Sequence, residues 1–447
     1  MKGRGRRSAA SSLAFLVAVA HAPVTGAPQA AETPSGFATT VLAKPGADAP
    51  RAGTGIPLAA AGVSSNRPPA AEATAAGLAG DATRTTFRLD LSTGVTAEIF
   101  TLANPYRVVV DLPDVSFRLP TATGQDGHGL VKMFRYGLFA EGKGRIVLDT
   151  TGPVRVDKAG MAAAGSGIVL TFDLIAIAPE SFGMGTGAQR SEHAHPRPGT
   201  DDDAPQKPRN QGKAVVMIDP GHGGIDGGAV GASNLLEKNV VLAVAKELRQ
   251  QLMAKGRYDV RMTRTSDVFV SLDGRLQASS KAGADLFISL HADSLAESGF
   301  ASSIRGATVY TLSERASDEQ ARLMAEKENA SDIVAGLNAA EGEAADQVKS
   351  ILIDLMRREI ANFSADFSNV LVRTMKQLVT LSRDPQRSAA FKVLKQTHSP
   401  SVLVELGYLS HAEDEKLLNS PPWQKQAAAS IAAAIDTYFA KRRASAP

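Results

Sequence analysis

The chain has 447 residues, of which 43% are hydrophobic and 21% are charged, so it contains enough apolar residues for a sizeable folded core. Its net charge is +3, but four positive charges lie before residue 8, and the remainder of the chain would carry −1. This balance argues against a nucleic-acid-binding surface. The chain has no cysteine, which excludes disulfide bonds as a source of stability.

Residues 1–31 have the features of a secretory signal peptide: a basic start, MKGRGRR, then a short apolar stretch and then small residues. The apolar stretch is shorter than the roughly 20 residues that span a bilayer, and no later segment reaches that length. We therefore expect an exported, soluble protein without a membrane span. A retained amphipathic anchor is the alternative, and the pair Arg6-Arg7 leaves the export route open.

Two stretches of biased composition flank a segment of short apolar runs. Residues 32–82 are rich in Ala, Pro, Gly and Ser, which predicts a disordered tether because such a segment buries too little apolar surface. Residues 83–177 contain runs such as YRVVVDLP and GIVLTFDL, separated by Gly, Pro and Asn, which predict a small all-β domain. Residues 178–212 predict a polar linker; His193 and His195 within it could hold a metal weakly, but we interpret them as solvated.

Strands and helices alternate in residues 213–443. The run AVVMI is followed by a helical pattern from Glu237, by YDVRMTR, by a helical pattern at 271–283 and by ADLFISL. GATVYTL and SVLVELG predict further strands, and an amphipathic helix with cations in its last turn closes the chain. The alternation predicts an α/β fold, a twisted, mostly parallel sheet flanked by helices, preceded by the small all-β domain.

Polar residues stand at the ends of three of these predicted strands. His222 follows the first strand, His291 follows ADLFISL, and Glu405 lies at the end of SVLVELG, while Glu237 begins a helix. Because ligands bind where the carboxyl ends of parallel strands meet, we expect these side chains to converge. Two imidazoles and a carboxylate suit a zinc ion with one position open for water, and a further carboxylate could act as a general base.

The glycine-rich turn around His222, DPGHGGIDGG, has other interpretations: it could be a simple strand-to-helix connection or a phosphate-binding loop. No G-K-[ST] sequence follows it and no acidic residue stands at the Rossmann offset, which argues against phosphate. Its glycines instead fit a loop that bends tightly enough to direct His222 inward. We interpret His398, which precedes a strand, and His411, which begins a polar turn, as non-ligands.

Several motifs in fixed order, VVMIDPGHGGIDGGAVG, KAGADLFISLHAD and SPSVLVELGYLS among them, closely resemble the zinc-dependent N-acetylmuramoyl-L-alanine amidases of bacterial cell walls over about residues 214–440. The resemblance implies a zinc ion held by His222, Glu237 and His291, with Glu405 as the catalytic residue. It also implies hydrolysis of the amide between N-acetylmuramic acid and L-alanine of the stem peptide in peptidoglycan. The alternatives are a zinc peptidase acting within the stem peptide and a non-catalytic peptidoglycan-binding protein.

The segment 83–177 is similar to the AMIN domain that often precedes such amidases, most recognisably in NPYRVVVDLPD and GRIVLDT. The resemblance implies that it binds peptidoglycan and localises the enzyme to the periplasmic side of the division septum, where the wall is split. A β spacer without binding function is the alternative. We expect a monomer.

The stretch 313–366 is long for a connection between two strands, and it is acidic and helical in character. It resembles the insertion of division-associated amidases, in which a helix supplies a carboxylate to the zinc until a protein activator displaces it. The blocking residue stays open among five glutamates, and a solvated acidic helix pair is the alternative. The five are Glu319, Glu326, Glu328, Glu341 and Glu343.

Overall fold

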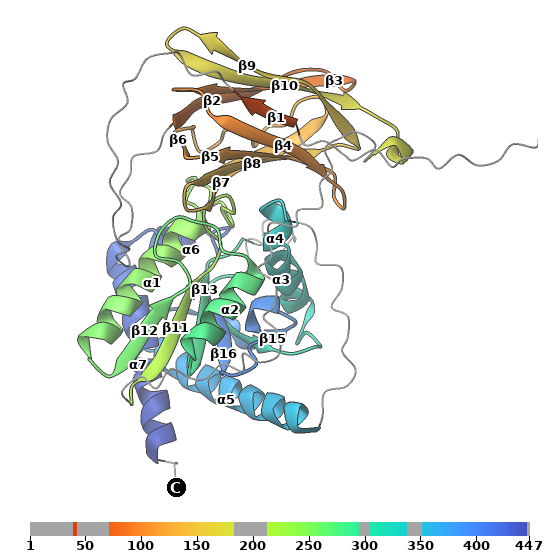
Figure 1. Ribbon diagram of the computed structural model, residues 1–447. Helices are drawn as coiled ribbons and strands as arrows, with labels where there is room; N and C mark the ends of the chain where they lie inside the picture. Colours follow the sequence, from red (N-terminus) through yellow and green to blue (C-terminus); the bar gives the residue numbers. More distant parts are fainter. Residues whose placement is uncertain (1–38, 43–70, 183–211, 295–303, 338–350, 445–447) are drawn as a thin grey trace, which may run out of the picture. The chain divides into compact units, whose positions relative to one another are not determined.

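The computed structural model describes residues 39–42, 71–182, 212–294, 304–337 and 351–444 (Figure 1). The predicted signal peptide, most of the predicted tether and most of the predicted linker, with His193 and His195, lie outside the described residues. Among the helices that are described, none combines the length and the apolar character needed to cross a bilayer.

The N-terminal β domain consists of two sheets of five strands each, and most neighbouring strands in them are antiparallel. One sheet has the order β1-β4-β5-β8-β7 and the other β6-β2-β3-β10-β9. The strands are β1 (Thr39–Leu42), β2 (Ala71–Gly80), β3 (Arg84–Leu91), β4 (Thr96–Leu102), β5 (Arg107–Pro113), β6 (Val115–Phe117), β7 (Val131–Ala140), β8 (Lys143–Thr150), β9 (Val154–Ala164) and β10 (Gly167–Ala176). Side chains from both sheets form one buried cluster, in which the rings of Phe87 and Phe172 lie 5.1 Å apart. The predicted all-β domain is therefore a sandwich.

The start of this domain differs from the sequence prediction. Strand β2 lies within the segment 32–82 that was expected to be a disordered tether, and β1 adds four more residues of that segment to a sheet. In β2, Ala71 and Ala73 are fully buried and the strand pairs with β3 and β6. Alanine is small enough to be buried in a closely packed sandwich, but its β-propensity is low. An alanine-rich composition therefore does not indicate a strand.

The C-terminal α/β domain has a six-stranded sheet of order β12-β11-β13-β16-β14-β15. Its pairings are parallel except for β14 with β16. The elements are β11 (Ala214–Pro220), α1 (Glu237–Ala254), β12 (Tyr258–Met262), α2 (Leu272–Ala282), β13 (Leu286–His291), β14 (Ala307–Leu312), α3 (Glu319–Asn329), α4 (Ser331–Val334), α5 (Ile351–Met375), β15 (Leu381–Ala389), β16 (Ser401–Glu405), α6 (Ala412–Leu418) and α7 (Pro421–Ala444). The predicted mostly parallel, helix-flanked sheet is confirmed.

Helices cover both faces of this sheet, so its central strands are apolar on both sides. Helices α1, α5 and α7 pack on the face that presents Val216 and Ile218 of β11. Helices α2 and α3 pack on the face that presents Val215 and Met217. The face of α1 toward the sheet carries apolar residues at helical spacing, from Val240 to Leu252.

The stretch 313–366 is divided between two roles. Helices α3 and α4 lie in its first part, whereas α5 runs beyond residue 366 and buries Phe367 and Leu371 in the core shared with α7. Glu341 and Glu343 lie outside the described residues. Only α3 and α4 therefore remain as described candidates for a segment that covers a site.

Candidate metal centre

Three parallel strands bring the predicted site residues to one edge of the sheet. Strand β11 ends two residues before His222, β13 ends at His291, and β16 ends at Glu405. His291 and Glu405 are direct partners in the pairing of β13 with β16. Glu237 is the first residue of α1, which starts beside the loop that follows β11. The carboxyl ends of the strands thus place all four side chains together, as the sequence predicts.

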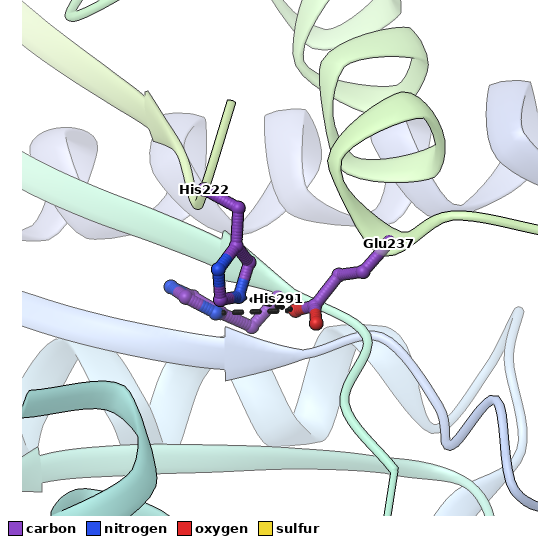
Figure 2. A group of neighbouring side chains, drawn as sticks. All are labelled: His222, Glu237 and His291. Carbon is purple, nitrogen blue, oxygen red and sulfur yellow. Dashed lines mark ion pairs between the residues drawn. The ribbon is translucent and has the colours of Figure 1, made fainter. Parts of the chain in front are cut away.

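The side chains of His222, Glu237 and His291 meet at one point (Figure 2). Glu237 Oε1 lies 3.2 Å from His222 Nε2 and 3.2 Å from His291 Nδ1. All three residues are buried, and neither of these nitrogens has a hydrogen-bond partner among the described residues. Buried polar atoms without partners are costly, so this convergence fits a metal ion bound by two imidazoles and a carboxylate.

Backbone groups hold Glu237 in place. Its Oε1 accepts a hydrogen bond of 2.8 Å from the backbone N–H of Ala292, and its Oε2 accepts one of 2.8 Å from Ala229. Gly228 passes so close, with φ 66°, that a Cβ at this position would lie 2.6 Å from Glu237 Oε2. A glycine is required there by both the backbone conformation and the lack of space.

Two buried arginines hold the loop that carries His222. Arg275 Nη2 donates to the carbonyl oxygen of His222 at 2.9 Å, and Arg264 Nη2 donates to that of Gly221 at 2.7 Å. Arg275 is itself paired with buried Asp219 at 2.7 Å. His222 has a left-handed backbone, φ 56°, which costs on the order of 1–3 kcal/mol for a residue other than glycine. The arginines stabilise this strained conformation, which directs the imidazole inward.

The carboxylates of the site favour positive charge between the two imidazoles. Burial alone would lower the pKa of His222, but Asp226, Glu237 and Glu328 outweigh it and raise that pKa well above its ordinary value. Burial is likewise outweighed at His291, first by Glu328 and then by Glu237, which raise its pKa to about 10. A site that stabilises protonated imidazoles in this way is electrostatically suited to a divalent cation.

Glu405 lies in a drier environment than an ordinary carboxylate. It is fully buried, its Oε2 accepts a hydrogen bond of 3.0 Å from the backbone N–H of Asp293, and its Oε1 has no partner among the described residues. Burial raises the pKa of Glu405 well above its usual range; His291 opposes the rise, and Asp293 adds to it. A carboxylate with a free oxygen and a raised pKa is suited to accept a proton and then to donate it.

Of the three candidate glutamates that the structure describes, Glu328 of α3 lies at the site. Its Oε2 lies 3.0 Å from His291 Nδ1 and 3.5 Å from His222 Nε2. Glu319 and Glu326 instead pair with Arg322 on the exposed side of the helix. Ala321, Met324 and Ala325 are buried, and Glu328 continues this face at helical spacing. That spacing is the sequence signal that could have singled it out.

Little space remains beside these residues. The cavity lined by His222, His291 and Glu328 has a volume of about 10 Å³, which is room for roughly one water molecule. Sequence reasoning did not single out four residues that support the site: Asp226, Arg264, Arg275 and Lys327. Lys327 forms an ion pair with buried Asp293, which comes two residues after His291.

Comparison with known proteins agrees with this geometry. Residues 216–437 match the family described as N-acetylmuramoyl-L-alanine amidase, and residues 79–172 match the AMIN domain. The chain is 38% identical over 236 residues to N-acetylmuramoyl-L-alanine amidase AmiA of Escherichia coli strain K12, covering 53% of this chain and 79% of that protein. It is 31% identical over 358 residues to AmiC of Escherichia coli O6:H1, covering 76% and 83% respectively.

Among solved structures, amidase AmiC2 of Nostoc punctiforme is 28% identical, with a TM-score of 0.37, over 52% of this chain and 99% of that one. The family match covers the strand ends that carry His222, His291 and Glu405, and the relatives are matched over most of their length. The chain therefore belongs to the N-acetylmuramoyl-L-alanine amidase family, with an AMIN domain ahead of its amidase domain.

Proposed function

We propose that this peptidoglycan amidase holds a zinc ion between His222 Nε2, His291 Nδ1 and Glu237, and uses it to hydrolyse the amide between N-acetylmuramic acid and L-alanine. The observation that carries the proposal is the pair of buried imidazole nitrogens that face one carboxylate oxygen and have no hydrogen-bond partner in the described parts of the chain. Nitrogen and oxygen donors in this number are the ligand set of a catalytic zinc site.

Bound zinc would polarise the amide carbonyl and lower the pKa of a water molecule at its open position. Glu405 would then take a proton from that water as its oxygen bonds to the amide carbon. As the carbon–nitrogen bond breaks, Glu405 would return the proton to the departing amine of L-alanine. The products are a glycan strand with a free lactyl carboxylate and a peptide with a free L-alanine amino terminus.

In the described state the active site would be closed. Glu328 would occupy the position that water and substrate need, and the remaining cavity of about 10 Å³ has no room for a glycan or a peptide. Helices α3 and α4 would therefore act as an inhibitory cover, and a protein activator would be needed to displace them. Glu328 supports this role because it is the described glutamate of this segment that points at the imidazoles.

The remaining parts of the proposal concern where the enzyme works. Export through residues 1–31 would deliver it to the periplasm, and the AMIN domain would bind peptidoglycan and bring the amidase domain to the division septum. Wall splitting between daughter cells is a process in which uncontrolled amide hydrolysis would be harmful. A cover over the zinc site is consistent with that need.

The experiment that tests the activity is digestion of purified sacculi, followed by mass spectrometry of the soluble peptides. We expect peptides that begin with a free L-alanine amino terminus. In Glu405→Ala we expect the rate of their release to fall by about 10²–10⁴-fold while zinc stays bound. Peptides cut within the stem would instead indicate a zinc peptidase. Binding without any release, even by a variant freed of its cover, would indicate a non-catalytic wall-binding protein.

A further inference from the structure

The loop after His222 turns back and returns a carboxylate to the His222 imidazole. Gly223 and Asp226 exchange two backbone hydrogen bonds, of 2.8 and 3.1 Å, and so close a tight turn. Gly223 and Gly224 have φ angles of 128° and 56°, which glycine adopts readily. As a result, Asp226 Oδ2 lies 2.9 Å from His222 Nδ1.

Asp226 is buried and its two oxygens have separate tasks. Oδ1 accepts a hydrogen bond of 3.1 Å from the backbone N–H of Gly228, whereas Oδ2 accepts from His222 Nδ1 and, at 2.6 Å, from the hydroxyl of Ser331. An ionised carboxylate can only accept, so His222 Nδ1 must carry the proton. When the imidazole is neutral, the lone pair is then on Nε2, the nitrogen that faces Glu237.

We propose that Asp226 is a positioning residue of the metal centre: it fixes the tautomer and the ring orientation of His222, and it anchors the cover through Ser331. This inference rests on the proposed function, because it requires a metal at His222 Nε2. A carboxylate that accepts from the outer nitrogen of a metal-binding imidazole also raises the basicity of the inner nitrogen. The buried Oδ2 of Asp226 therefore contacts both the proposed metal ligand and the segment that would block the metal.

The Asp226→Asn variant is the sharpest test because it keeps the size of the side chain. An asparagine has one acceptor oxygen and no charge. If that oxygen accepts from Gly228, the NH2 group faces two donors; if it faces His222, the Gly228 N–H loses its partner. We expect zinc binding by the full-length, metal-stripped chain to weaken by about 10–100-fold, measured by competition with a chromophoric chelator.

Asp414→Asn is the matched control. Asp414 is equally buried and accepts backbone hydrogen bonds from Gly306 and Tyr408, but it does not contact a proposed zinc ligand. We expect its zinc affinity to equal that of the wild type. The unfolding midpoint of each metal-free variant shows whether lost affinity is lost folding, and Asp226→Ser provides a second variant if Asp226→Asn does not fold.

The outcomes separate the two proposals. Wild-type zinc affinity in folded Asp226→Asn, or an equal loss in Asp414→Asn, would overturn the role of Asp226. If wild type and His222→Ala bind zinc alike, the proposed metal centre itself is wrong. For Ser331→Ala we expect zinc affinity near that of wild type and a higher basal rate on sacculi, because the Asp226–His222 contact stays while the cover loses an anchor. If Ser331→Ala lost as much zinc affinity as Asp226→Asn does, the assignment of the positioning role to Asp226 would be overturned.

Discussion

The base of the site and the segment that covers it are built differently. The base consists of His222, His291 and Glu405, which follow or end strands, and of Glu237, which begins helix α1. Backbone N–H groups of Ala229, Ala292 and Asp293 fix the two carboxylates, and buried arginines fix the carbonyl oxygens around His222. These contacts come from the strands, the loops that follow them and helix α2, all of which belong to the core of the domain, so we expect the base to persist when the cover moves.

The cover, helices α3 and α4, is attached by side chains. Its anchors are Lys327 on Asp293, Asn329 on the backbone of Lys392, Ser331 on Asp226, and Asp332 on the backbone N–H of Leu272. Polar contacts of this kind contribute a net of about 0.5–1.5 kcal/mol each. The cover also buries Ala321, Met324 and Ala325 against the sheet, so an activator that displaces it must replace these apolar contacts as well as the polar ones.

The largest expected effect comes from breaking the base at Glu237. Glu237→Gln removes the charge that both imidazoles face, so we expect zinc affinity to fall by about 100-fold or more and sacculus hydrolysis to fall to background. Glu415→Gln is a control at another buried glutamate, which accepts from Ser233 and does not contact the base. Competition with a chelator measures the zinc affinity of both variants. Unchanged affinity in Glu237→Gln would contradict the assigned ligand set.

The sequence predicts the base better than the cover for a physical reason. Residues that end buried parallel strands meet wherever such a sheet forms, so His222, His291 and Glu405 could be placed together before the fold was known. The position of the Glu328 side chain depends on how the helix that follows strand β14 is oriented when it packs against the sheet. The sequence alone does not distinguish the five glutamates of this acidic stretch. In the structure, the packing of the apolar face of α3 determines which of them points at the site.

Other features left no readable signal. Strand β15 has the sequence LSRDPQRSA, and a polar strand with a proline is tolerated because β15 lies at the edge of the sheet. Arg264 and Arg275 look like surface residues in the sequence, since arginine is rarely buried unless paired. Asp226 stands four residues after His222, but only the turn at Gly223 and Gly224 brings its carboxylate back.

The pH dependence of zinc binding sharpens the contrast between base and cover. The neighbouring carboxylates raise the pKa values of His222 and His291, the latter to about 10, so protons compete with zinc for these imidazoles in the metal-free protein. Zinc must displace those protons, so its apparent affinity should fall as the pH falls. Chelator competition between about pH 6 and pH 8 measures the slope, and a flat profile would contradict it.

Removing the charge of the cover should weaken that dependence. Glu328 contributes most among the carboxylates to the raised pKa of His291, so Glu328→Gln should lower this pKa, and zinc should then displace less proton near neutrality. The affinity slope of the variant should therefore be shallower than that of the wild type. An unchanged slope would mean that Glu328 does not face the imidazoles in solution.

The smallest expected effect, and the one of opposite sign, is on the basal rate. Glu328→Gln weakens the contact of the cover with the zinc position by the worth of one charged hydrogen bond, about 1.5 kcal/mol or more, so basal hydrolysis of sacculi should rise about tenfold. Glu326→Gln is the matched control two residues away, because that side chain is exposed and pairs with Arg322. We expect it to keep the wild-type rate.

This point substitution separates inhibition from folding, which deletion of the segment would not. Deleting residues 319–350 would also remove Ala321, Met324 and Ala325 from the apolar cluster on that face of the sheet. Lost activity after deletion could then reflect an exposed core rather than a needed helix. Glu328→Gln leaves those contacts in place, so a rate equal to that of wild type, with zinc bound and the unfolding midpoint unchanged, would contradict the inhibitory role of the cover.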